Sequence, residues 1–68
     1  MSQSQAKGYA LTEAYNDVKY AGERVEKAER EWLSAPEEEK DKKENELLKA
    51  RSYLKEEVDR LRKLKNQY

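Results

Sequence analysis

Large and small apolar residues recur along the first half of the chain with a period of seven. A large apolar residue opens each repeat, and an alanine follows three positions later. The large residues are Leu11, Val18, Val25 and Trp32, and the alanines are Ala14, Ala21, Ala28 and Ala35. This spacing is typical of a coiled-coil helix, and alanine at one core position lets a second helix approach closely. The pattern predicts a helix over about residues 9–33 that packs against another helix.

Gly22 lies beside this stripe and has two interpretations. It could be a notch for a neighbouring helix, or a tolerated weak point that costs about 1 kcal/mol relative to alanine. The residues before the helix, 1–8, are rich in Ser and Gln, and we expect them to form a flexible N-terminal arm.

A break interrupts the pattern at residues 34–36. Pro36 lacks the amide hydrogen that a continuing helix needs. Ser34 and Glu37 have the spacing of a capping box, and three glutamates follow Pro36, where negative charge favours the start of a helix. We therefore predict a turn at 34–36 and a second helix over about residues 36–66. A single long kinked helix is the alternative, and the capping signals favour the hairpin.

The second helix divides into a polar half and an apolar half. Residues 37–46 contain no apolar side chain, and one stripe follows at spacings of three and four: Leu47, Ala50, Leu54, Val58, Leu61, Leu64 and Tyr68. Reversal of the chain at 34–35 would pair residue i with residue 69 − i. Val25, Ala28 and Trp32 would then face the polar half, covered by lysine stems or by a second chain. The same register predicts an Arg24–Glu46 ion pair.

The composition favours one small helical domain that associates. Charged residues make up 44% of the 68 residues and apolar residues 35%. A two-helix hairpin over residues 9–68 is marginally stable alone, and the chain has no cysteine or histidine for a disulfide or a familiar zinc site. We expect pairing with itself or with another helical protein, most simply as a homodimeric four-helix bundle. The polar N-terminus and the lack of a membrane-spanning run predict an intracellular, soluble protein, cytoplasmic or nuclear.

Enzyme chemistry has little support in this chain. Without histidine and cysteine, the usual metal-bound water, thiolate and Ser-His mechanisms lack their parts. The two glycines are isolated, so no phosphate-binding loop is present. We expect no catalytic residue, no cofactor, no metal and no small-molecule ligand.

Nucleic-acid binding is the alternative function. Arg51, Lys55, Arg62 and Lys65 lie along one flank of the second helix, where two copies could form a phosphate-binding surface. In size and architecture, but in no motif, such a protein is similar to the Rop type of plasmid regulator, a hairpin dimer that binds RNA. A net charge of zero opposes this alternative, because affinity for phosphates depends on excess positive charge. Membrane association is not expected, because the apolar stripes are needed for helix pairing.

The sequence thus predicts an all-α helical hairpin whose function is non-enzymatic protein–protein association, as a dimerisation, adaptor or scaffold module. The predicted interface residues are those of the two stripes: Leu11, Ala14, Val18, Ala21, Val25, Ala28, Trp32, Leu47, Leu54, Val58, Leu61 and Leu64.

Overall fold

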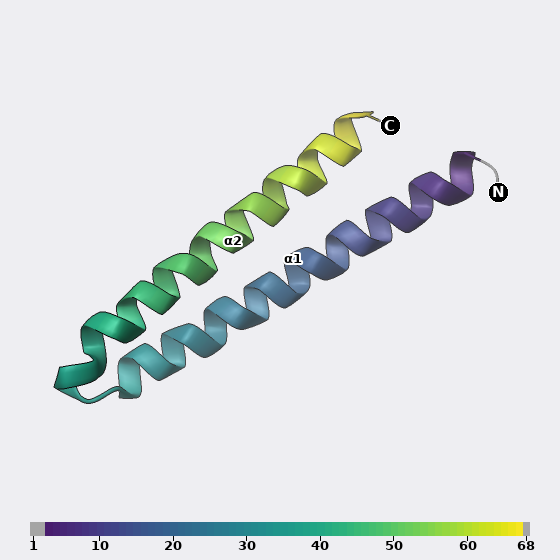
Figure 1. Ribbon diagram of the computed structural model, residues 1–68. Coiled ribbons are helices and arrows are strands. Elements are labelled where there is room, and N and C mark those ends of the chain that lie inside the picture. The colour runs from purple at the N-terminus through teal and green to yellow at the C-terminus, as the bar shows by residue number, and fades with distance from the viewer. Residues whose placement is uncertain (1–2, 68) are drawn as a thin grey trace.

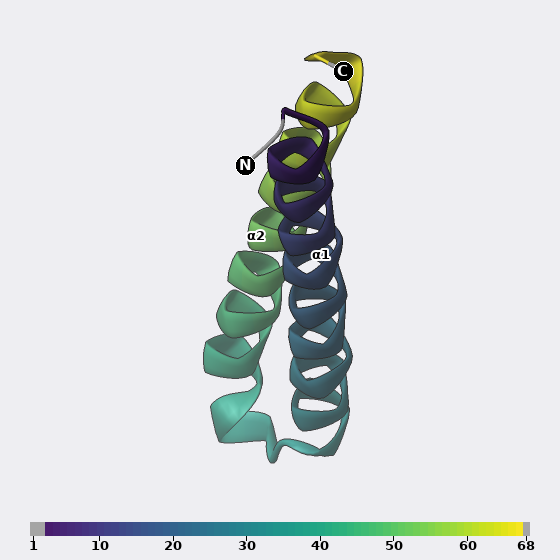
Figure 2. The same ribbon diagram turned by 90° about the vertical axis from the view of Figure 1, so that its right-hand side faces the viewer.

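Two long antiparallel helices form the fold (Figure 1). In the computed structural model, α1 spans Gln3–Ser34, a short 3-10 helix, η1, spans Glu37–Glu39, and α2 spans Lys40–Gln67. The backbone is described for residues 3–67 and the side chains for residues 8–67. Figures 1 and 2 show the helices side by side along the long axis of a molecule that measures 54 × 15 × 12 Å. The predicted two-helix hairpin is confirmed, and the alternative of one long helix is wrong.

The first helix begins earlier than the pattern indicated. It starts at Gln3, so residues 3–8 of the predicted arm are helical, and residues 1 and 2 lie outside the described part of the chain. It ends at Ser34, one residue beyond the predicted end. The heptad pattern marks only where α1 contacts α2, and a helix continues beyond its contacts while no residue breaks it.

The turn differs from the predicted capping box. The Ser34 hydroxyl donates to the carbonyl oxygen of Arg30 at 2.9 Å, and it lies 3.4 Å from that of Glu31. Pro36 is extended, with φ −65° and ψ 159°, and no side chain caps the helix that follows. The prediction was wrong because Ser34 is the last residue of α1, where the free acceptors are carbonyls of its own helix.

Lys40 closes the C-terminal end of α1 instead. Its Nζ donates to the carbonyl oxygen of Trp32 at 2.7 Å and to that of Leu33 at 3.3 Å, and it lies 5.2 Å from the centre of the Trp32 ring. The last turn of α1 contains no basic residue of its own. Lys40 therefore supplies the positive charge that a helix C-terminus favours.

The pairing of α1 with α2 is shifted from the predicted register. Glu29 contacts Arg51 rather than residue 40, and Asp17 contacts Arg60 rather than residue 52. The chain reverses close to residue 39, because residues 35–39 are taken up by the extended link and by η1. The predicted Arg24–Glu46 ion pair is not formed, and the Arg24 guanidinium lies over the ring of Tyr53 at 5.6 Å.

This shift gives the apolar residues near the turn a partner within the chain. Val25 and Ala28 pack with Leu47 and Ala50 in one buried cluster, and Trp32 packs against it. The prediction that these residues face the polar half of the second helix was therefore wrong for Val25 and Ala28, whereas Lys40 of that half does cover the ring of Trp32. That half contributes Lys40 to the end of α1, and the apolar half of α2 covers Val25 and Ala28.

Candidate association surface

The small residues of the two stripes form the line of closest contact between the helices. The buried residues of the described chain are four alanines and three larger residues: Ala14, Ala21, Ala28, Ala50, Val25, Leu47 and Leu61. No large side chain among the described residues is completely enclosed. The other predicted interface residues are only half-buried, and they are Leu11, Val18, Trp32, Leu54, Val58 and Leu64. One hairpin therefore covers its apolar stripes incompletely.

One side of the contact line carries mainly charged groups. Residues seven apart lie above one another on a coiled-coil helix, so Asp17 and Arg24 share one edge of α1, and Tyr53 and Arg60 share one edge of α2. Asp17 contacts Arg60 at 3.7 Å, and Arg24 lies over Tyr53. We call this the charged side.

A groove on the charged side has a floor of alanine and rims of charge. Its volume is about 420 Å³. The residues that line it are Arg24, Lys27, Ala28, Glu31, Glu46, Lys49 and Ala50.

The opposite side has an apolar centre between two polar contacts. Glu29 contacts Arg51 at 3.3 Å, and the Lys65 Nζ lies 5.0 Å from the centre of the Tyr15 ring. Midway between these contacts, seven residues from each, are Gly22 on α1 and Val58 on α2. The register therefore places Gly22 and Val58 across from each other. We call this the Gly22 side.

The centre of the Gly22 side is open. A Cβ atom added to Gly22 would have no heavy atom within 4 Å beyond its own helix backbone and its chain neighbours. Val18 and Leu54 lie between this centre and the contact line of the helices, and both are half-buried. Of the two interpretations of Gly22, the open space is compatible with a notch for another helix.

Two exposed leucines border the Gly22 side near the turn. Leu33 is 68% exposed and Leu48 is 50% exposed. Leu33 is four residues from Glu29 and Leu48 is three residues from Arg51, both towards the turn. Since Glu29 contacts Arg51, the two leucines lie at one level, each on the outer edge of its helix.

Glu57 lies on the contact line between the helices, and the sequence interpretation missed it. Its side chain is only 12% exposed, its Oε2 has no hydrogen-bond partner, and the nearest cation is the Nη1 of Arg60 at 3.8 Å. The Asp17–Arg60 and Arg24–Tyr53 contacts bracket it and place it opposite Ala21. The spacing from Ala50 and to Leu64, seven residues each, could have identified it as a core position.

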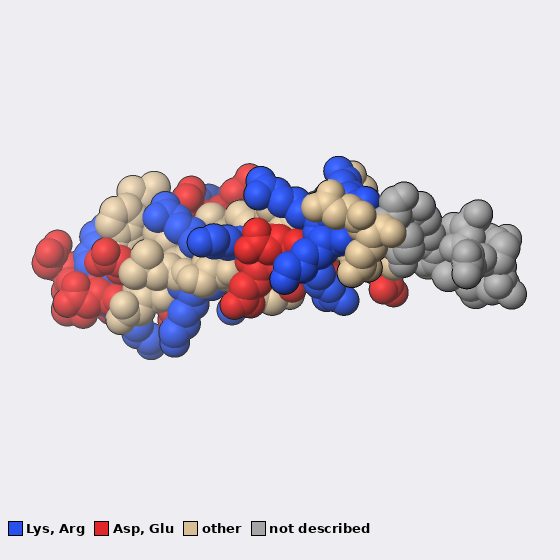
Figure 3. Space-filling model, turned by 90° about the horizontal axis from the view of Figure 1, so that it is seen from above, with Lys and Arg blue, Asp and Glu red and all other residues tan. Residues whose placement is uncertain are grey.

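The four predicted nucleic-acid contacts divide into two pairs. Arg51 and Lys65 reach across to Glu29 and Tyr15 of the same chain. Lys55 and Arg62 are exposed and lie on the outer edge of α2, seven residues apart. In Figure 3, basic and acidic side chains are interspersed over the face in view, and acidic ones gather at the end of the molecule that carries the turn.

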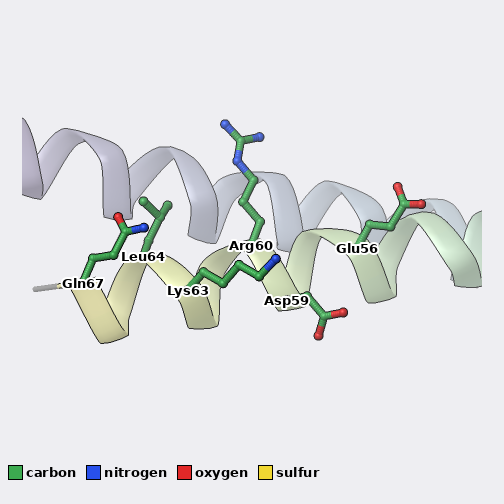
Figure 4. Close-up of a pocket in the computed structure, with 6 residues that line it drawn as sticks. All are labelled: Glu56, Asp59, Arg60, Lys63, Leu64 and Gln67. Atoms are coloured by element: carbon green, nitrogen blue, oxygen red, sulfur yellow. The ribbon is translucent and has the colours of Figure 1, made fainter.

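A second depression lies on α2 alone, near its C-terminal end. Its lining residues are Glu56, Asp59, Arg60, Lys63, Leu64 and Gln67. Figure 4 shows the carboxylates of Glu56 and Asp59 pointing away from each other, so these groups do not converge on one point. Paired acid and base catalysis needs such convergence.

Metal binding and membrane crossing have no structural basis in the described residues. No group of three or more acidic side chains could hold a metal ion, and neither helix has the length and apolar character needed to cross a membrane. Comparisons of the chain with protein-family models, with curated proteins and with solved structures found no match.

Proposed function

We propose that this chain is a protein–protein association module that pairs with a second copy of itself. The observation that carries the proposal is the incomplete burial of the apolar stripes. Alanines fill most of the contact line, whereas Leu11, Val18 and Val58 keep part of their surface in water. A second hairpin packed on these residues would bury them and add the apolar area that one hairpin lacks.

The size of the molecule supports the same conclusion. A chain of 68 residues can bury only about 60% of the surface that it exposes when unfolded, so such domains are marginally stable. Disulfides are excluded as a stabilising device, because the chain has no cysteine. Association is the remaining general means of burying more surface.

The test is the molar mass in solution, measured by light scattering over a concentration series with circular dichroism on the same samples. We expect a helical species at twice the chain mass of 8.1 kDa. A helical monomer at every concentration would contradict self-pairing. The exposed charge variant Lys49→Glu, on the rim of the groove on the charged side, serves as a control that leaves the mass unchanged.

Titration of the same samples with a short RNA at low salt tests the alternative function. We expect no binding, because Arg51 and Lys65 already contact groups of their own chain and the net charge is zero. A complex that dissociates with added salt, and that Lys55→Glu and Arg62→Glu abolish, would instead favour RNA binding.

A further inference from the structure

We propose that the second copy docks on the Gly22 side with both turns at the same end, so that α1 of each copy packs on α2 of the other. This inference rests on the proposed self-association and specifies its surface and its direction. The two-fold axis would run parallel to the helices, through the space above Gly22 and Val58.

The choice of side follows from the cost of removing charge from water. Docking on the charged side would bury the Asp17–Arg60 pair and the rims of the groove, which carry Arg24, Glu31 and Lys49. Buried charges lose hydration that they recover only with well-placed partners. On the Gly22 side the centre is glycine and valine, with open space beside the glycine. A second helix can approach this centre closely without desolvating a charge there, although a dimer that covers the whole face also covers the Glu29–Arg51 pair and Lys65 at its two ends.

The area of this side is sufficient for a stable dimer. The hairpin is 54 Å long and 15 Å wide between its Cα atoms. A face of those dimensions offers about 800 Å² per copy, which is close to what each partner buries in a specific interface of standard size.

The direction follows from the residues on the outer edges of the Gly22 side. Leu33 and Leu48 lie at one level near the turn, and both are exposed. With the turns together, Leu33 of each copy meets Leu48 of the other. The two-fold symmetry makes this contact twice, so all four exposed leucines are covered. With the turns at opposite ends, α1 lies on α1 and α2 on α2, and the leucines are separated.

Charge on the same edges does not distinguish the two directions. Glu26 and Lys55 lie three residues before Glu29 and four residues after Arg51, so they are level with each other. The parallel dimer places Glu26 of each copy near Lys55 of the other, which attract, and Lys19 near Arg62, which repel. The reversed dimer pairs Lys19 with Glu26, which attract, and Lys55 with Arg62, which repel. The direction therefore rests on the two leucines.

Cysteine cross-linking distinguishes the two directions, because the natural chain contains no cysteine. Chains carrying Leu33→Cys are mixed with chains carrying Leu48→Cys and oxidised mildly. We expect this mixture to give the cross-linked pair in high yield. A mixture of Leu33→Cys with Thr12→Cys is the matched comparison, because those positions meet only in the reversed dimer. Predominant cross-linking of that mixture would overturn the proposed direction.

A charge reversal gives an independent readout of direction. The parallel dimer brings Lys19 level with Arg62 of the second copy, where like charges repel. Lys19→Glu should therefore lower the dissociation constant, by roughly threefold or more because symmetry changes two exposed pairs. In the reversed dimer the same substitution would remove the attraction to Glu26 and raise the dissociation constant.

The docking side is tested by Val58→Glu, with helicity followed by circular dichroism. We expect a folded chain whose dissociation constant rises by about a hundredfold, since a carboxylate at the centre of the interface would lose its hydration. If this chain unfolds, cross-linking of Leu33→Cys with Leu48→Cys still reports the side. If the natural chain dimerises but Val58→Glu does not weaken it, and the cross-link does not form, the docking side is wrong and self-association stands. If the natural chain is monomeric, the proposed function itself fails.

Discussion

Lys40 contributes more to this hairpin than its place in a polar segment indicates. Its ammonium group donates to two carbonyl oxygens at the end of α1 and lies over the ring of Trp32. The same side chain therefore satisfies free acceptors, offsets the negative end of the helix dipole and covers an aromatic ring. One lysine thus connects the two helices and pairs with carbonyl groups at the end of α1.

Lys40→Met should lower the free energy of unfolding by about 1 kcal/mol, the usual contribution of a helix-end interaction. Urea denaturation followed by circular dichroism measures this change. Lys42→Met removes the same charge from an exposed position and should have a much smaller effect. Equal effects of the two substitutions would mean that net charge, rather than the contact with α1, is responsible.

Glu57, unlike Lys40, is expected to destabilise the hairpin, because it is a charged residue on the contact line between the helices. Its buried Oε2 has no hydrogen bond, and such an oxygen costs about 1–3 kcal/mol relative to a satisfied one. The residues seven positions away on either side, Ala50 and Leu64, are apolar. A stability penalty at this position is therefore expected from its surroundings.

Glu57→Leu should raise the free energy of unfolding by about 1–2 kcal/mol, because an apolar side chain replaces a poorly satisfied carboxylate. Thermal and urea denaturation measure the change. Glu56→Leu, at an exposed neighbouring position, is the matched control and should be nearly neutral. A loss of stability in Glu57→Leu would show that the contact with Arg60 outweighs the cost of burial.

At the scale of the helices, sequence periodicity predicted the elements well but not their alignment. The seven-residue pattern and Pro36 identify two helices and the break between them, because both signals are local. The register depends on how many residues the turn uses, and the extended Pro36 followed by η1 adds residues that no periodic pattern marks. Glu57 is a different case, because its seven-residue spacing from Ala50 and Leu64 does mark a core position in the sequence, but the apolar stripe passes through the adjacent Val58.

The alanines of the contact line set the distance between the helices. Ala28 and Ala50 belong to the same buried cluster. Ala28→Leu should therefore force the helices apart and lower the free energy of unfolding by about 1–3 kcal/mol, as overpacking does. Denaturation by urea tests this, with exposed Lys27→Leu as the neighbouring control. Unchanged stability of Ala28→Leu would mean that the contact line accommodates larger residues.

For the whole molecule, the Gly22 side is defined by the register between α1 and α2 and not by either helix alone. The sequence identified the apolar stripes as an interface, but most of their small residues are used between the two helices of one chain. The Gly22 side depends on which residues the fold places opposite one another, such as Glu29 with Arg51 and Tyr15 with Lys65. Those long-range pairings follow from the turn, and no single helix shows them.

Self-association makes stability depend on chain concentration. If the folded state is a dimer, dilution favours unfolding by mass action, and the midpoint of thermal unfolding must fall as the sample is diluted. We expect the natural chain to show this dependence over a hundredfold range of concentration, followed by circular dichroism. Val58→Glu should show a lower midpoint than the natural chain at every concentration, because its dimer is weaker. A constant midpoint for the natural chain would identify a monomeric hairpin and contradict self-association.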